Sequence, residues 1–177
     1  MKRSIRLSLS FLLTAAASHA VMHAETAQAA SWIRRSAPSC KAVNQTAEVY
    51  SGNQIWNSNI SPNYPNAVFV CEVPDDSSKP HNTISDFQLT GYDANSGQAV
   101  EAKACVAFRG SLGGSCNAAQ KTSVAGKGWF NLKPTRTVWS TYPSDFPYVA
   151  VTLPAMEFYD PLGGGYSILA GYVSYYQ

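Results

Sequence analysis

Short apolar segments alternate with turn-forming residues along most of the chain. Valine, tyrosine, phenylalanine and threonine concentrate in these segments, and glycine, proline, asparagine and aspartate fill the gaps between them. Many short strands between such turns are typical of an all-β sandwich or barrel. The pattern therefore predicts an all-β fold, a single antiparallel β-sandwich domain over residues 30–177. Strands are expected at residues 47–51, 54–58, 66–73, 83–92, 98–108, 115–124, 128–133, 136–140, 148–153 and 165–176.

The segment 98–108 shows the period of two that a strand requires. Val100, Val106 and Phe108 share one face, whereas charged side chains and Cys105 share the other. The same stretch is rich in alanine, so a helix over 98–109 is also compatible with its intrinsic propensity. The hairpin signals that flank it favour the strand.

A weak internal similarity appears at an offset of 80 positions in the numbering. Leu89 matches Leu169, and Gly91-Tyr92 matches Gly171-Tyr172. Two similar hairpins within one sandwich would produce this similarity, but so would chance. The matches are too few to define a repeat.

The first 29 residues have the composition of a secretory signal peptide. Basic residues precede a short apolar stretch at 7–17, and small residues follow in an A-x-A pattern that ends at Ala29. A second A-x-A-like site ends at Ala20, so cleavage at either position stays open. The apolar stretch is too short to span a membrane, and no later segment approaches the roughly 20 residues needed. The protein is expected to be secreted or periplasmic, without a membrane span.

A hairpin predicts the pairing of two of the four cysteines. An even number of cysteines in an exported domain points to two disulfide bonds, although four cysteines permit three pairings. A two-residue turn at Gly110-Ser111 would place Cys105 opposite Cys116. A four-residue loop centred on the same point gives the same facing pair and places it at the closer, non-hydrogen-bonded site.

The two remaining cysteines are then expected to pair with each other. A Cys40–Cys71 bond would tie the first segment of the exported domain to the strand at 66–73. Metal or redox chemistry is the alternative for these thiols, but the chain contains no C-x-x-C motif.

Charge and composition exclude several classes of function. The whole chain has 13 Lys/Arg and 11 Asp/Glu, and the signal segment accounts for three of the former and one of the latter, so the exported domain is formally neutral. A neutral domain without a basic run lacks the electrostatic footprint of a nucleic-acid binder. No cluster of His, Cys and carboxylate residues has the spacing of a metal site, and no motif implies a cofactor.

Candidate catalytic groups are few. His81 is the only histidine after residue 29, and it lies in a polar loop without a recognisable nucleophile, so it is expected to be solvated. Asp75, Asp76 and Asp160 could supply an acid pair for glycoside cleavage, but nothing in the sequence brings them together.

A second acidic segment resembles part of a calcium-binding loop. Asp93, Asn95 and Glu101 match some ligand positions of that loop, but its glycine and its bidentate acid are missing. The segment is therefore interpreted as a hairpin turn, whose geometry Asp, Asn and Gly suit.

Four stretches of the chain are distinctive when they are taken together: "VFVCEVPDD" at 68–76, the hairpin at 87–108, "YVAVTLP" at 148–154 and "YSILAGYVSYY" at 166–176. In this combination the chain resembles a group of small secreted bacterial proteins without assigned activity. The resemblance implies a β-sandwich and supplies no mechanism. Such relatives often carry a cysteine where this chain has Val151, which implies a different set of disulfides here.

The abundance of aromatic residues is the one feature of the sequence that points to a binding surface, since the chain has four tryptophans and ten tyrosines. An exposed row of rings could stack on sugars or on a protein partner. In the last strand, Tyr172 and Tyr176 share the more polar side and are the candidate ligand-binding residues, whereas Tyr175 is expected in the core. Core packing is the alternative for all of them. Tryptophans expected in the core are Trp56, Trp129 and Trp139.

Two functions fit these observations. The first is a secreted, non-enzymatic binding or structural module whose ligand is a glycan or an extracellular protein. The second is a small extracellular hydrolase that acts on polysaccharide or cell-wall material. A neutral domain with one histidine and no recognisable nucleophile favours the first.

Overall fold

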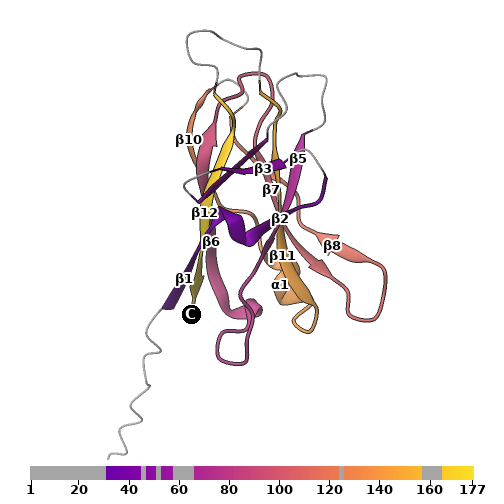
Figure 1. Cartoon of the computed structure of the whole chain (residues 1–177). Helices are drawn as coiled ribbons and strands as arrows, with labels where there is room; N and C mark the ends of the chain where they lie inside the picture. Colours follow the sequence, from indigo (N-terminus) through magenta and orange to yellow (C-terminus); the bar gives the residue numbers. More distant parts are fainter. Residues whose placement is uncertain (1–30, 45–46, 51–52, 58–65, 124–125, 157–164) are drawn as a thin grey trace, which may run out of the picture.

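Two antiparallel β-sheets pack face to face around a shared core (Figure 1). The structure is a computed structural model, and it describes residues 31–44, 47–50, 53–57, 66–123, 126–156 and 165–177. The two sheets remain separate and do not close into a barrel. The expected fold, an all-β antiparallel sandwich with two disulfide bonds, is confirmed.

Sheet A is organised around the last strand of the chain. Strand β12 pairs with β6 along one edge, and both β4 and β1 pair with its other edge. Strand β1 reaches the same end of the sheet as the carboxyl terminus (Figure 1). The strands, from one edge to the other, are β10 (Gly128–Leu132), β6 (Ile84–Asp93), β12 (Ile168–Tyr176), then β1 (Ser31–Ser36) and β4 (Gln54–Asn57), with β3 (Ala47–Tyr50) beyond β4.

Sheet B is organised around the strand that precedes β12 in the chain. Its order is β2 (Cys40–Ala42), β5 (Ala67–Glu72), β11 (Phe146–Leu153) and β7 (Glu101–Ala107), with β8 (Gly114–Cys116) and β9 (Gln120–Lys121) both paired to β7. Short helical turns connect the strands, and α1 lies at the lower end of the sandwich in Figure 1. The turns are η1 (Ala37–Ser39), η2 (His81–Thr83) and α1 (Thr137–Thr141).

The core follows from alternation along the strands. Every second residue of β6 from Phe87 to Asp93 is buried, and the residues between them point away from sheet B. Strand β11 shows the same alternation toward sheet A. Each sheet therefore has one face toward the shared core and one outer face. The largest fully buried side chains are Trp139, Tyr172, Tyr176, Phe69, Phe87, Ile55, Leu89, Leu153, Leu169, His81, Val100 and Val106.

Both expected disulfide pairings are confirmed. Cys105 lies opposite Cys116 in the β7–β8 ladder, and Cys40 lies opposite Cys71 in the β2–β5 ladder. The Cα atoms are 4.0 Å apart in each pair. The hairpin has the four-residue loop rather than the two-residue turn, because the backbone N–H of Phe108 donates to the carbonyl of Gly113 at 2.9 Å. The pair Cys105–Cys116 therefore lies at the non-hydrogen-bonded site.

One expected strand is a helix instead. Residues 137–141 form the single turn α1, although their threonines and valine favour a strand. Tertiary contacts explain the difference, because Asn117 accepts a hydrogen bond from the N–H of Val138 at 3.0 Å. The same turn places Trp139 in the core. The alanine-rich segment near 98–109, by contrast, is a strand over 101–107.

The weak internal similarity corresponds to an approximate two-fold arrangement. Val70 of β5 pairs directly with Ala150 of β11, its counterpart 80 positions later. The following strands, β6 and β12, are likewise paired with each other in the opposite sheet. The units β5–β6 and β11–β12 thus cross the sandwich in the same way. A bulge between Leu169 and Gly171 breaks the correspondence, because it reverses which side chains face inward.

Candidate functional site

The candidate tyrosines of β12 face the core, contrary to the expected orientation. Tyr172 and Tyr176 are each 2% exposed, whereas Tyr175 is half-buried on the outer face. The alternation itself was predicted correctly, but the wrong side was assigned to solvent. At this depth the two rings pack against core residues and present no flat face to a ligand.

Their hydroxyl groups reach acceptors at the end of β5 in the opposite sheet and just after it, which explains why a polar-looking side can be buried. Tyr172 donates to the carbonyl of Glu72 at 2.7 Å, and Tyr176 donates to the carbonyl of Pro74 at 2.8 Å. The ring of Tyr172 stacks on Phe87 with centroids 5.2 Å apart. Burial raises the pKa of Tyr172, and it raises the pKa of Tyr176 to about 12.

The raised pKa predicts a loss of stability at alkaline pH. The neutral phenol of Tyr176 is favoured in the folded state, so its contribution is fully present below pH 10 and is lost as pH rises from about 10 through about 12. We expect the urea midpoint of the wild type to fall over this window. The variant Tyr176→Phe should show a smaller fall. Identical pH profiles of the two proteins would contradict the assignment.

An aromatic row crosses the outer face of sheet A. Trp56 of β4 pairs with Ile168 of β12, Ile168 pairs with Tyr92 of β6, and Tyr92 pairs with Trp129 of β10. All four side chains point away from sheet B, because their strand neighbours are the buried ones. We call these four residues the Trp129 row. Four strands that are far apart in the sequence thus contribute one continuous apolar band.

Two tryptophans of this row were expected in the core. Trp129 is 75% exposed, and its ring meets Tyr92 edge to face with centroids 5.6 Å apart. Trp56 is half-buried and stacks on Tyr166 at 5.4 Å. For these two the expectation was wrong, whereas Trp139 is in the core as expected. The ring contacts along the row fix the orientation of each aromatic side chain without burying Trp129.

Polar side chains lie beside the Trp129 row on the same face. The next register row contains Ser36, Gly171, Thr90 and Asn131, in order across the sheet. A Cβ atom at Gly171 would lie 2.5 Å from the carbonyl oxygen of Arg35, so only glycine fits there. A depression lies beside Gly171 on this face. Residues that line it include Arg34, Arg35, Ser36, Thr90, Gly171 and Val173.

A second aromatic pair marks the other end of the outer face. Trp32 of β1 pairs with Tyr175 of β12, which in turn pairs with Asp86 of β6. The guanidinium carbon of Arg34 lies 5.1 Å from the centroid of the Trp32 ring. Partial burial works to raise the pKa of Asp86, but hydrogen bonds from Gln88 and Lys133 hold it below the ordinary value. The face therefore has aromatic groups at both ends and hydrogen-bonding groups between them.

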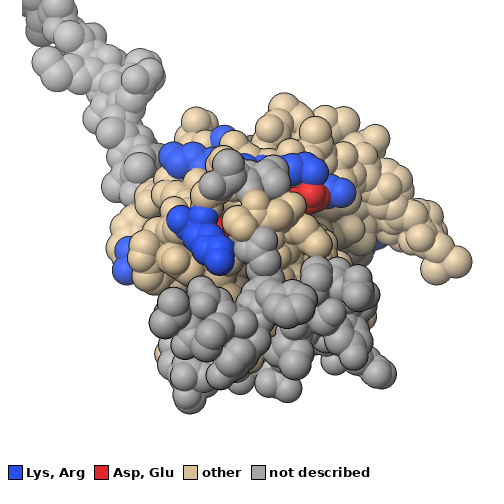
Figure 2. All heavy atoms as spheres, turned by 90° about the horizontal axis from the view of Figure 1, so that it is seen from above, with Lys and Arg blue, Asp and Glu red and all other residues tan. Residues whose placement is uncertain are grey.

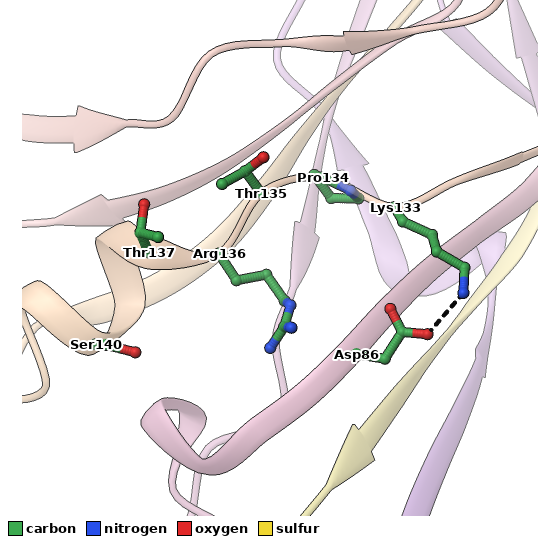
Figure 3. Close-up of a pocket in the computed structure, with 7 residues that line it drawn as sticks. All are labelled: Asp86, Lys133, Pro134, Thr135, Arg136, Thr137 and Ser140. Carbon is green, nitrogen blue, oxygen red and sulfur yellow. Dashed lines mark hydrogen bonds and ion pairs between the residues drawn. The ribbon is translucent and has the colours of Figure 1, made fainter.

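A pocket between β6 and the segment before α1 carries charged groups that are already paired (Figure 3). Arg136 projects between the helix and the strand and donates to the carbonyl oxygens of Ile84 and Ser85. Lys133 lies 3.0 Å from the Asp86 carboxylate. These contacts hold the lower end of the sandwich together. In this pocket the charges of Lys133 and Asp86 neutralise each other, and backbone carbonyl groups hold the Arg136 guanidinium.

His81 is buried rather than solvated, which corrects the expectation from sequence. Its Nδ1 atom lies 2.9 Å from the carboxylate of Asp75, and its Nε2 atom lies 3.3 Å from the carbonyl oxygen of Tyr142. Both partners are acceptors, so the ring links the loop after β5 to the residue that follows α1. This arrangement contains no hydroxyl or thiol nucleophile among these partners, and the histidine serves the packing of the fold.

The other candidate acids are also engaged in local structure. Asp76 accepts hydrogen bonds from the side chain and backbone of Ser78 and from the backbone of Lys79, and these lower its pKa. Asp160 lies outside the described residues. No acid pair for glycoside cleavage is formed by Asp75 and Asp76, whose carboxylates bind different segments.

The partial calcium-loop segment is a turn held by a buried carboxylate. Asp93 accepts from the N–H of Asn95 at 3.0 Å and from the hydroxyl of Ser167 at 3.1 Å. Its second oxygen accepts from the N–H of Val100 and the hydroxyl of Thr122. The interpretation as a turn is supported by these bonds. Within the described residues, no three His, Cys, Asp or Glu side chains gather where they could hold a metal ion.

Comparison of the chain with protein-family models and with curated protein sequences gives no match. In the described part of the chain, no helix is long and apolar enough to cross a membrane. The candidate functional site therefore rests on the outer face of sheet A alone. Sequence reasoning missed it because its members are adjacent only through strand register.

Proposed function

We propose that the protein is an exported, non-enzymatic module that captures a glycan on the outer face of sheet A. The observation that carries this proposal is the Trp129 row, an apolar band across four strands with an exposed tryptophan at its edge. The exposed indole ring of Trp129 is complementary to the flat face of a sugar ring, where C–H groups point outward. Aromatic rings supply large contact area with little conformational freedom to lose.

The polar groups beside the row suit the edges of a sugar. Hydroxyl and amide side chains of Ser36, Thr90 and Asn131 lie in the adjacent register row, and Gln88 accepts a hydrogen bond from Asn131. Such groups both donate and accept hydrogen bonds, as sugar hydroxyls do. A protein partner is supported less well, because the core of a protein interface is a broad apolar patch rather than a narrow band between polar rows.

The non-enzymatic part of the proposal rests on how the candidate catalytic groups are used. His81, Asp75, Asp76 and Asp93 all make bonds that fix loops or connect the two sheets. None of these four side chains projects from the outer face of sheet A. A binding function therefore explains the exposed aromatic row without requiring a reaction.

Substitution of the row tests the proposal directly. Replacing Tyr92 and Trp129 together by alanine should weaken retention on an immobilised polysaccharide at least about tenfold, as for central aromatic residues of other binding faces. Since both rings lie on the surface, the melting temperature should change little. Phe146→Ala is the matched control, because Phe146 is 61% exposed in sheet B, next to β7 rather than in sheet A. Equal retention of the double variant and the wild type would refute the proposal.

Export is the second part of the proposal. The signal-like segment 1–29 supports it, and the two disulfide bonds suit an oxidising compartment. Amino-terminal sequencing of protein recovered from the periplasm or the medium should give a chain that begins just after Ala20 or just after Ala29. Recovery of a mature fraction that still begins with Met1 would contradict export by this route.

A further inference from the structure

The charges on the outer face of sheet A favour one class of glycan. Lys133 and Asp86 neutralise each other at the β6 edge, 3.0 Å apart. Arg34, on the opposite edge, has no ion pair with any carboxylate of the described residues, and its contact is the Trp32 ring. Arg35, by contrast, pairs with the buried Tyr172 and therefore projects from the other side of β1. The β1 edge of the face is therefore positively charged.

We infer that the bound glycan is an acidic polysaccharide, whose carboxylate group lies beside Arg34 at the depression next to Gly171. This inference rests on the proposed function and specifies its ligand. A guanidinium group matches a carboxylate with two parallel hydrogen bonds, which makes arginine the suited residue for this contact. The ring of Trp32 holds the guanidinium of Arg34 on the outer face, so less conformational freedom is lost on binding.

The position of the depression supports a chain rather than a single sugar. It lies between the Trp129 row and the Trp32–Tyr175 pair. Register rows on one face of a strand are two residues, or about 7 Å, apart, so the aromatic ends lie about 20 Å from each other. A polysaccharide that follows the direction of β12 would contact both ends and would pass over the arginine edge between them.

The end of the sandwich seen from above also shows more basic than acidic side chains (Figure 2). In sheet B, the carboxylate of Glu101 is paired with Lys121, 2.5 Å away. On the described outer face of sheet A, Lys133 is paired with Asp86, whereas Arg34 of β1 has no carboxylate partner among the described residues. An anionic ligand would complement it, whereas a neutral glycan would leave it unused.

The test compares charged and neutral forms of the same polymer. Affinity electrophoresis is run through gels that contain polygalacturonate or alginate, and through gels that contain each polymer after its carboxyl groups have been reduced to alcohols. We expect the wild type to bind at least one acidic form about tenfold more tightly than its reduced form, the factor for loss of one charge-assisted hydrogen bond. At about 0.5 M NaCl, where charges are screened within a few ångströms, the difference should shrink.

Variants assign the preference to the β1 edge. The variant Arg34→Gln should bind acidic and reduced polymers equally, whereas Arg35→Gln, on the other side of β1, should keep the preference. Arg34→Lys should keep part of the preference, because the charge remains but the paired hydrogen bonds do not. The matched control Lys41→Gln/Lys103→Gln removes two exposed charges from sheet B and should keep the full preference. Thermal melting of each variant shows whether it is folded.

The outcomes separate this inference from the proposed function. Equal binding of acidic and reduced polymers by the wild type would overturn the acidic ligand and leave glycan capture intact. A preference that survives Arg34→Gln would overturn the assigned position. Failure to bind any polymer, charged or neutral, would overturn both proposals.

Discussion

Replacing Trp139 by alanine should lower the free energy of unfolding by about 3–5 kcal/mol, the usual range for loss of a large aromatic side chain from a core. Trp139 is 1% exposed, and its ring meets Phe87 edge to face with centroids 5.6 Å apart. Its indole N–H donates to the carbonyl of Cys105 at 2.9 Å, so the substitution also leaves a buried acceptor without its donor. Urea denaturation of the disulfide-intact protein measures the effect.

Trp129→Ala is the matched control, because it removes the same side chain from an exposed position. Its cost should stay within about 0.5 kcal/mol. Similar costs for the two variants would contradict the distinction between core and outer-face tryptophans. Trp139→Phe should fall between them, since it keeps most of the buried area but loses the hydrogen bond to Cys105.

Replacing Asp93 by alanine should destabilise the fold by more than about 3 kcal/mol. The carboxylate accepts hydrogen bonds from four groups, two of them on the neighbouring turn and two on residues distant in sequence. Each buried donor that loses its acceptor costs about 1–3 kcal/mol. Asp93→Asn should cost less, because it keeps the shape of the side chain and one of its two acceptor oxygens.

Glu101→Gln provides the control for Asp93. Glu101 belongs to the same acidic segment, but its partner is the exposed Lys121, and pairs of this kind contribute at most about 1 kcal/mol. The two variants are compared by thermal and urea denaturation. A small effect at Asp93 that matches the effect at Glu101 would show that the buried network does not hold the turn between β6 and β7.

The features that sequence predicted correctly depend on local chain geometry. The facing pair Cys105–Cys116 follows from counting outward from a turn, and the glycine at that turn, Gly110, adopts a φ of 81° that suits few other residues. The period of two along 101–107 likewise needs only neighbouring residues. The second disulfide then follows because two cysteines remain.

The orientation of β12 could not be predicted in this way. Its polar-looking side is buried because the hydroxyl groups of Tyr172 and Tyr176 find carbonyl acceptors at Glu72 and Pro74, about a hundred residues earlier in the chain. The bulge after Leu169 also changes the side on which later residues lie, and no residue pattern marks it. Both effects come from tertiary contacts.

The sequence suggested an exposed row of aromatic side chains, but the residues assigned to it, Tyr172 and Tyr176, are buried. The abundance of tyrosine and tryptophan pointed to a row of rings, and such a row exists. Its members come from β4, β12, β6 and β10, and only the register of those strands brings them together. Its hydrophobicity predicts that Trp129 is in the core. In the structure Trp129 lies on edge strand β10 with its side chain on the outer face, and it is exposed.

The most direct measurement maps the ligand contact on the folded protein. Amide chemical shifts of the isotope-labelled, disulfide-intact protein are recorded while an acidic polysaccharide fragment, an oligogalacturonate or oligoalginate, is added. We expect shifts at Tyr92, Trp129 and Ile168, with the indole N–H signal of Trp129 among the largest. Shifts confined to the outer face of sheet B, or no shifts with either fragment or with its carboxyl-reduced form, would contradict glycan capture by sheet A.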